Sequence, residues 1–232
     1  MRVIVHDSAD AVATTAAWMI ADEARIAVTV RRRFVMAVSG GRTPWVMLRA
    51  LADENILWEH VQVVQVDERV APPGDPDRNL THLRESLLAR VPLPPEQLHA
   101  MPVEASDLSA AANQYGRLLQ DIAGTLPVLD LVHLGLGPDG HTASLVPGDP
   151  VLNVTDADVA MTGIYQSRPR MTLTYPIINR ARRILWVVTG EDKAGPLARL
   201  CNRDPSIPAG RVVQDNAIVL ADRAAAEKLH TN

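Results

Sequence analysis

The sequence contains very little cysteine and very little lysine. Its single cysteine, Cys201, excludes a disulfide framework within the chain and a zinc site built from cysteine thiolates. A chain that forms no disulfides suits a reducing compartment, so we expect a cytoplasmic protein. Lysine occurs only at Lys193 and Lys228, which leaves arginine to carry nearly all of the positive charge.

The sequence also lacks a long apolar run and an excess of positive charge. No segment approaches the length of a membrane span, and the first residues enter a short strand pattern without the apolar stretch of a signal peptide. The formal net charge is −4, whereas a nucleic-acid-binding domain presents a basic face. We therefore expect neither a membrane nor a nucleic acid as a partner.

The chain does have enough apolar sequence for a large core. Its 232 residues are 47% hydrophobic, and short apolar runs alternate with segments of helical periodicity. Strands are predicted at 2–5, 34–38, 61–66, 98–101, 128–136, 159–163, 170–173, 184–188 and 217–220, with helices between most of them. This alternation predicts an α/β fold: a mainly parallel, doubly wound sheet with helices on both faces. The pattern continues throughout, so we expect a single Rossmann-like domain over residues 1–232.

The most informative stretch runs from Leu129 to Gly148, where an apolar strand pattern ends in a glycine-rich turn. This turn carries Asp139 and His141. Open α/β sheets bind their ligands at the carboxyl ends of the strands. Imidazole is the usual general base near neutral pH, and a carboxylate two residues away can orient it or bind substrate hydroxyls. His133, which lies within the strand itself, is predicted to be structural.

A second glycine turn follows the predicted strand at 34–38. It consists of Ser39, Gly40, Gly41, Arg42 and Thr43, followed by Pro44. Glycines allow backbone N–H groups to point inward, and a helix that starts at Pro44 with Thr43 as its cap adds the positive end of its dipole. The hydroxyl groups of Ser39 and Thr43 add further donors. An anion site and an ordinary strand–turn–helix connection both fit this pattern.

Charged residues mark three further places in the sequence. Asp67, Glu68 and Arg69 directly follow a predicted strand, and three charges at one strand end favour a functional role over a solvated loop. Arg170 begins an extended segment. Lys193 lies in the first turn of a predicted helix, where a cation opposes the helix dipole and is favoured when an anion is bound nearby.

Three other chemistries fit the sequence poorly. The segment from Gly135 to Gly140 matches the G-x-G-x-x-G pattern of dinucleotide sites, but Asp139 would repel the pyrophosphate and Pro138 removes a donor. Ser144 does not lie in a G-x-S-x-G elbow, which disfavours a serine hydrolase. The histidines show none of the spacings typical of metal sites, so we expect no metal.

Five segments together resemble the 6-phosphogluconolactonase family, which shares its fold with the glucosamine-6-phosphate deaminases. They are residues 39–44, 67–69 with Asn79, 135–145, 170–174 and 190–193, and they occur in the family's order. Two positions depart from the family pattern: Arg78 replaces a serine and Val146 replaces a phenylalanine. The resemblance implies an α/β fold of the deaminase and lactonase type.

The resemblance also implies a function: hydrolysis of 6-phospho-D-glucono-1,5-lactone to 6-phospho-D-gluconate, the second step of the pentose phosphate pathway. It implies that His141 is the general base and that no cofactor is needed. Asp139 and Arg69 are the further candidate catalytic residues, and the oxyanion donor is either Arg69 or the N–H groups of a glycine turn. The candidate residues for binding the substrate and its phosphate are Ser39, Gly40, Gly41, Arg42, Thr43, Asp67, Arg170 and Lys193.

Two alternatives remain open. One is an isomerase or deaminase that acts on an amino-sugar phosphate. The related deaminases carry a glutamate five residues after the histidine, where this chain has Val146, and a tyrosine at the position of Arg69. The other is a sugar-phosphate sensor without catalytic activity, which would lack the base. We expect the sugar-phosphate lactone as the small-molecule partner and a monomer or small homo-oligomer.

Overall fold

The computed structural model describes residues 1–229, and its largest element is a seven-stranded sheet. Every pair of neighbouring strands in this sheet is parallel. In spatial order the strands are β1 (Arg2–His6), β10 (Ala217–Asp222), β9 (Arg183–Val188), β6 (Leu131–Leu134), β2 (Phe34–Val38), β3 (Val61–Gln65) and β5 (Leu98–His99). The predicted parallel sheet is therefore confirmed, although β5 and β6 are shorter than expected.

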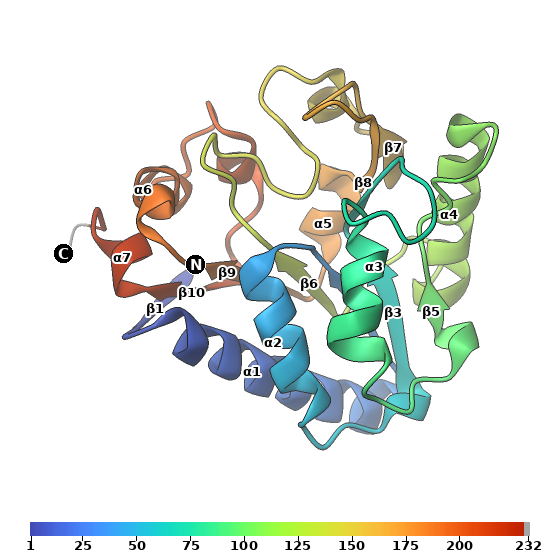
Figure 1. The fold of residues 1–232 in the computed structure, drawn as a ribbon, viewed down its shortest axis with the longest axis horizontal. Coiled ribbons are helices and arrows are strands. Elements are labelled where there is room, and N and C mark those ends of the chain that lie inside the picture. Colours follow the sequence, from blue (N-terminus) through green and yellow to red (C-terminus); the bar gives the residue numbers. More distant parts are fainter. Residues whose placement is uncertain (230–232) are drawn as a thin grey trace.

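Helices cover both faces of the sheet, as the doubly wound pattern predicts. They are α1 (Ala9–Arg31), α2 (Arg42–Ala52), α3 (Asn79–Leu83), α4 (Leu108–Ala123), α5 (Tyr175–Arg180), α6 (Ala194–Cys201) and α7 (Arg223–Ala226). One apolar core contains side chains from α1, α2 and α3, and the other contains side chains from α4, α5, α6 and α7. Figure 1 shows α4 at the opposite end of the molecule from α6 and α7.

The central strands are apolar because both of their faces are buried. All five residues of β2 and all four of β6 are buried, including the polar His133. Alternating residues of β2 belong to opposite cores: Val35 and Ala37 to one, Phe34 and Met36 to the other. Since successive side chains of a strand point to opposite faces, a strand between two helical layers is apolar at most of its positions.

A second sheet was not predicted. It has three short antiparallel strands: β4 (Asp67–Arg69), β8 (Arg170–Leu173) and β7 (Val159–Met161). Asp67, Glu68 and Arg69 thus form a strand of their own instead of closing the strand before them. Three charged residues carry no strand periodicity, so only their pairing with β8 reveals the element. The sheet lies near the upper right of Figure 1.

Helix starts follow capping chemistry in some places and not in others. Ser8 caps α1, because its side chain accepts a hydrogen bond from the Ala11 N–H at 3.2 Å. The cap predicted at Thr43 is wrong: α2 begins at Arg42, and its N-cap is Gly41, which offers no side chain. Gly41 has φ of 130°, a conformation that disfavours any residue with a Cβ atom.

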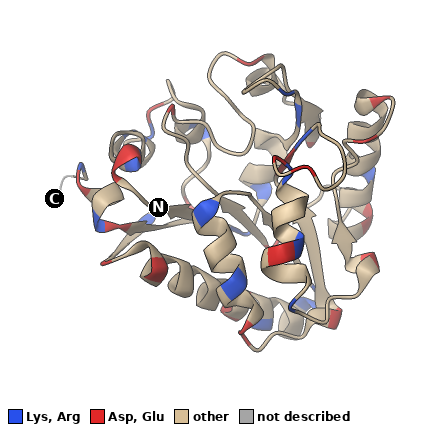
Figure 2. Ribbon diagram, viewed as in Figure 1, with Lys and Arg blue, Asp and Glu red and all other residues tan. Residues whose placement is uncertain are grey.

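Charged side chains are distributed over most of the surface elements. Segments coloured for lysine or arginine and for aspartate or glutamate are both scattered over the helices and loops in Figure 2. Within residues 1–229, no helix has the length and apolar character needed to cross a membrane.

Candidate functional site

A cleft of about 650 Å³ opens where the parallel strands end at their carboxyl termini. Its walls come from the turns after β2, β6 and β9 and from the second sheet. Every candidate residue except Asp139 lines the cleft: Ser39, Gly40, Gly41, Arg42, Thr43, Asp67, Arg69, His141, Arg170 and Lys193. Asp139 is hydrogen-bonded to His141 and so lies directly beside the cleft. The fold therefore gathers residues that are up to 154 positions apart in sequence (Ser39 to Lys193).

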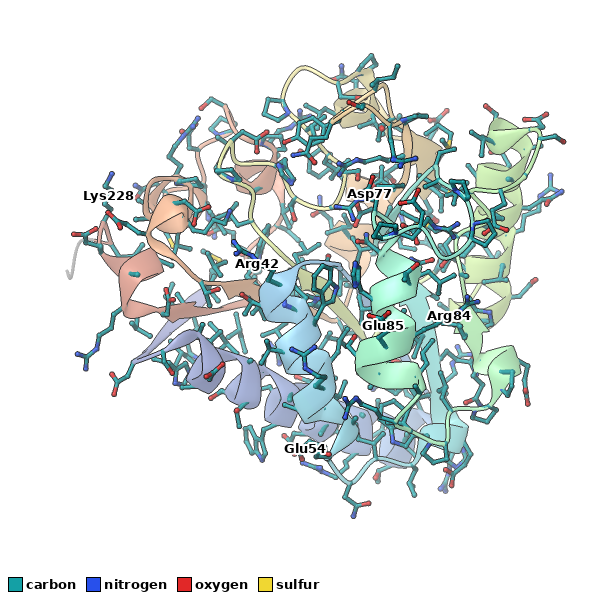
Figure 3. All side chains as sticks on the ribbon, in the orientation of Figure 1. Arg42, Glu54, Asp77, Arg84, Glu85 and Lys228 are labelled. Carbon is teal, nitrogen blue, oxygen red and sulfur yellow. The ribbon has the colours of Figure 1, made fainter. Side chains whose placement is uncertain are left out.

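The turn between β2 and α2 presents the start of a helix to the cleft. The first N–H groups of any helix have no intrahelical partner, and no side chain caps them in α2, so they remain available on the loop side. Arg42, labelled in Figure 3, is exposed at the first position of α2. Thr43 forms a hydroxyl–hydroxyl hydrogen bond of 2.6 Å with Thr189 at the end of β9. This arrangement combines a helix N-terminus, a cation and hydroxyl groups, which suits an anion.

The Ser39 hydroxyl was expected to donate to a bound anion, but in the structure it bonds to the protein backbone. The side chain is buried, and Oγ donates a hydrogen bond of 2.9 Å to the carbonyl oxygen of His133. The Ser39 N–H donates to Nδ1 of the same histidine at 3.2 Å. These two bonds join the end of β2 to β6. The hydroxyl is thus already engaged in the structure.

His133 is structural, as expected from its place within the strand. It is fully buried, and this burial lowers its pKa to about 3, so the ring is neutral at physiological pH. In the neutral ring Nδ1 acts as the acceptor for Ser39.

The turn after β6 holds the Asp139–His141 pair. The Asp139 Oδ1 atom lies 2.5 Å from His141 Nδ1 and also accepts the His141 backbone N–H at 3.1 Å. Burial raises the pKa of Asp139, but the hydrogen bonds and charge of His141 outweigh it, and the pKa lies below its ordinary value. The carboxylate therefore stays ionised and fixes the ring through Nδ1, which leaves Nε2 for chemistry in the cleft.

The same turn shows why its glycines are needed and why it is not a dinucleotide site. A Cβ atom at Gly137 would lie 2.1 Å from His141 Nδ1, so the ring packs directly on the glycine backbone. Gly140 has φ of 83° and a neighbouring Ile207 side chain. The chain then makes a tight turn closed by a bridge between Thr142 and Leu145 instead of entering a helix. The helix N-terminus that a dinucleotide requires is therefore absent after Gly140.

Glu68 organises the loop between the two sheets and is fully buried. Its two carboxylate oxygens accept backbone N–H groups from Arg69, Asn79 and Leu80, each at 2.8 Å. Arg78, only 2% exposed, lies 3.2 Å from Glu68 through Nε and 2.8 Å from Glu104 through a terminal nitrogen. A buried charge needs such partners, so Glu68 has a structural role instead of the functional one suggested by its sequence position.

Asp67 and Arg69 face the cleft from β4. Asp67 accepts the Ser144 hydroxyl at 2.6 Å and the Asn79 amide at 3.3 Å. Arg69 donates to Asn79 Oδ1 at 2.8 Å, while its Nε atom is buried without a protein partner. A Cβ at Gly40 would lie 1.9 Å from Asn79 Oδ1, so the first glycine turn packs against this network.

Arg170 is the most deeply buried cation that lines the cleft, with 4% of its surface exposed. It donates to Gln166 at 2.9 Å and to Ser144 at 3.4 Å, and its Nε atom has no partner. Burial lowers its pKa, and the charge of Arg69 lowers it further. Two guanidinium groups with unpartnered buried nitrogens create a strong preference for an anion between them.

Lys193 approaches the cleft from the opposite wall. It lies in the short turn Glu191–Lys193 ahead of α6, as expected, and forms an ion pair of 2.8 Å with Asp192. Its side chain is 20% exposed, so it can exchange this partner for a ligand. Within residues 1–229, no group of three or more histidine, cysteine, aspartate and glutamate side chains is arranged to hold a metal ion.

Four residues that contact the candidate residues were not among them. Asn79 and Ser144 belong to sequence motifs but are not among the predicted site residues, and no sequence motif contains Tyr165 or Gln166. Tyr165 donates a hydrogen bond of 3.2 Å to Asp139, and Gln166 accepts one from Arg170. Tyr165 and Gln166 lie between the extended segments predicted at 159–163 and 170–173. A position in a hairpin turn is the one feature of the sequence that could have indicated their role.

Comparisons with known proteins agree with this architecture. The family model described as glucosamine-6-phosphate isomerases/6-phosphogluconolactonase matches residues 7–220. A 6-phosphogluconolactonase from Synechocystis sp. is 37% identical over 211 residues, covering 88% of each chain. The crystal structure of 6-phosphogluconolactonase from Thermotoga maritima has a TM-score of 0.84 at 24% identity and covers 95% of this chain and 98% of that one. A monomeric glucosamine-6-phosphate deaminase has a TM-score of 0.85 at 22% identity, covering 98% and 100%. Both solved structures share the fold.

Proposed function

Because the chain belongs to the glucosamine-6-phosphate isomerase/6-phosphogluconolactonase family, we propose that it hydrolyses 6-phospho-D-glucono-1,5-lactone to 6-phospho-D-gluconate. This reaction is the second step of the pentose phosphate pathway. A curated relative at 37% identity over 88% of the chain carries the name of this activity. The proposal includes a cytoplasmic location, a single catalytic domain and a reaction without a cofactor.

The observation that carries the mechanism is the Asp139–His141 pair beside a cleft that contains several cations. Nδ1 of His141 is engaged by a carboxylate at 2.5 Å, so Nε2 is the nitrogen available to accept a proton from water. The cleft also contains Arg42, Arg69, Arg170 and Lys193, four cations suited to a dianionic substrate. A base and an anion site in one cleft are what hydrolysis of a phosphorylated lactone requires.

The phosphate binds at the start of α2. Unpaired N–H groups of the first helical turn donate to its oxygens, and Lys193 and Arg170 supply positive charge from the two walls. Anchoring the phosphate fixes the distance between the lactone carbonyl and His141. Such positioning converts a reaction between separate molecules into one within a complex.

Hydrolysis then proceeds by addition and elimination. His141 Nε2 removes a proton from water while the water oxygen bonds to the lactone C1, and the carbonyl oxygen becomes an oxyanion. Arg69, whose Nε has no protein partner, or the N–H groups of a glycine turn donate to that oxyanion. The C1–ring oxygen bond breaks as the tetrahedral intermediate collapses, and the imidazolium returns its proton to the ring oxygen.

The deaminase alternative is less well supported. Val146 is 5% exposed and apolar at the position where the related deaminases carry glutamate, so no carboxylate is available there to move protons. The likeness to a deaminase structure at 22% identity concerns the fold alone. A sensor without activity would not need a histidine oriented by a carboxylate.

The test is an assay of lactone hydrolysis on the purified chain. Fresh 6-phosphogluconolactone is supplied, and the 6-phosphogluconate formed is measured with a coupled dehydrogenase, with spontaneous hydrolysis subtracted at each pH. We expect a rate that is proportional to enzyme concentration. A rate equal to the spontaneous one, together with release of ammonia from glucosamine 6-phosphate, would replace the proposal with the deaminase alternative.

A further inference from the structure

Tyr165 lies at the tip of the hairpin that joins β7 to β8 and contacts both Asp139 and His141, the proposed base. Its hydroxyl donates to Asp139 Oδ2 at 3.2 Å and lies 3.5 Å from His141 Nδ1. The tyrosine and imidazole rings meet edge to face, with centroids 5.4 Å apart and an interplanar angle of 66°. Tyr165 therefore touches both members of the pair, although it is 24 positions from His141 in sequence.

The hydroxyl holds the carboxylate oxygen that the histidine does not use. Oδ1 of Asp139 contacts the His141 ring and backbone, and Oδ2 is left for Tyr165. A carboxylate held at one oxygen can rotate about its Cβ–Cγ bond, whereas one held at both oxygens has a fixed plane. Burial and the charge of Asp139 raise the pKa of Tyr165, so the phenol remains protonated and acts as the donor.

The tyrosine ring also contacts the anion-binding part of the cleft. The Arg170 guanidinium carbon lies 4.8 Å from the ring centroid, which is a cation–π distance. The next residue, Gln166, accepts a hydrogen bond from Arg170 at 2.9 Å. One hairpin tip thus contacts the candidate phosphate ligand with one face and the candidate base with its hydroxyl.

The hairpin tip is held firmly enough to place a side chain. Gln166 and Ser167 both have positive φ values, 51° and 69°, as in the tight two-residue turns of hairpins. Tyr165 and Arg168 are paired across the turn. Arg168 forms ion pairs with Asp75 at 3.0 Å and with Asp77 at 2.9 Å, and Asp77 is labelled in Figure 3. These bonds attach the tip to the loop that precedes α3.

We propose that Tyr165 is a positioning residue that fixes the plane of the Asp139 carboxylate and thereby the orientation of the His141 imidazole. The proposal rests on the proposed function, in which His141 is the base. Tyr165 takes no part in proton transfer. Its effect is on the rate of the chemical step, and its hydroxyl makes no contribution to holding the phosphate.

The variant Tyr165→Phe removes the hydroxyl and keeps the ring over Arg170. We expect kcat to fall about two- to tenfold, the effect of losing one hydrogen bond, while the Kd of 6-phosphogluconate changes less than twofold. Tyr175→Phe is a matched control. Its hydroxyl donates to the Pro208 carbonyl oxygen at 2.9 Å and its ring lies 4.9 Å from Arg211, but it is outside the cleft, so kcat should remain parental.

A double-mutant cycle shows whether Tyr165 acts through Asp139. In an Asp139→Asn background the Tyr165→Phe change should lose most of its effect on kcat, because the carboxylate it orients is gone. The His141 imidazole NMR resonances should also shift in Tyr165→Phe and remain parental in Tyr175→Phe. Additive effects of the two substitutions, or unchanged imidazole resonances, would overturn the proposal.

The proposed function and the role of Tyr165 can fail separately. If His141→Asn retains the parental kcat, the base assignment is wrong and the role of Tyr165 is overturned with it. If His141→Asn is inactive while Tyr165→Phe has parental kcat, the base assignment stands and only the positioning role is rejected.

Discussion

The two walls of the cleft are built by different means. The parallel wall consists of the turns after β2, β6 and β9 (residues 39–43, 135–141 and 189–193), where glycines and a helix start expose backbone groups. The antiparallel wall consists of β4, Asn79 and the tip of the β7–β8 hairpin, where buried polar side chains bond to one another. The first wall offers backbone N–H groups besides the side chains of Arg42, His141 and Lys193. The second wall offers the guanidinium groups of Arg69 and Arg170 and the carboxylate of Asp67.

This difference predicts that the two walls tolerate substitution differently. A backbone donor survives most substitutions except those that add a Cβ atom where the chain has no room. A buried side-chain network fails when any one partner is removed, because the remaining polar groups lose their bonds without regaining water. His141 belongs to the parallel wall but is oriented in part from the antiparallel one.

Replacing His141 should have the largest effect on activity. His141→Asn keeps hydrogen-bonding capacity and approximate size but removes the base, so we expect kcat to fall about 10²- to 10⁴-fold. Product binding should change little, because the phosphate contacts lie elsewhere. His60→Asn, at the amino end of β3, is the control and should match the parent. A folded His141→Asn protein with near-parental kcat would move the base assignment to Asp139 or Asp67.

Replacing the anion-binding cations tests the two walls against each other. Arg170→Ala should raise KM for the phosphorylated lactone by about thirtyfold, which corresponds to about 2 kcal/mol for a lost buried ionic contact. Lys193→Ala should raise KM less, since its side chain is more exposed. The parent should hydrolyse unphosphorylated gluconolactone poorly, and both variants should discriminate less between the two lactones.

Arg211→Ala is the matched control for Arg170, because Arg211 lies over a tyrosine ring outside the cleft. Its steady-state KM should equal that of the parent. If both cleft variants retained the parental preference for the phosphorylated lactone, the phosphate would have to bind elsewhere.

A Cβ atom in the parallel wall should impair catalysis more than stability. In Gly137→Ala the new methyl group would meet the His141 ring, which must move, so we expect kcat to fall about tenfold, a barrier increase of about 1.4 kcal/mol. Gly135→Ala is the control, because nothing lies within 4 Å of its Cβ position. Comparable kcat values for the two alanine variants would show that the ring has room to adjust.

The expected effect on activity is smallest at His133, whose role concerns stability and its dependence on pH. His133 has a folded pKa of about 3 against about 6.5 when unfolded, so the unfolded chain binds an extra proton between these values. Its stabilising contribution is complete above pH 6.5 and is lost as the pH falls. At pH 5 the loss reaches about 2 kcal/mol relative to pH 8.

Urea unfolding of the parent and of His133→Asn at several pH values measures this contribution. The variant should be less stable at pH 8 but should lose less stability on acidification. Parallel curves for the two proteins would mean that His133 gains a proton in the folded state without cost.

The sequence by itself determined the parallel sheet and the parallel wall of the cleft, which is formed by the turns after β2, β6 and β9. Apolar runs such as 34–38 and 184–188 are strands because both faces are buried, and glycines after them mark turns. Asp139 and His141 could be paired because they lie two residues apart, where local backbone geometry alone brings them together. The four arginine and lysine residues of the cleft were also identified from local position and motif.

Only the tertiary structure decided the antiparallel wall. Strand β4 exists because it pairs with β8 about a hundred residues later (Glu68 with Met171), and no local pattern encodes that pairing. The same packing buried Glu68 as a structural hub, engaged the Ser39 hydroxyl with His133 and brought Tyr165 to Asp139. Local sequence encodes backbone conformation and the direction of apolar faces, whereas contacts between distant side chains arise only when the layers pack together.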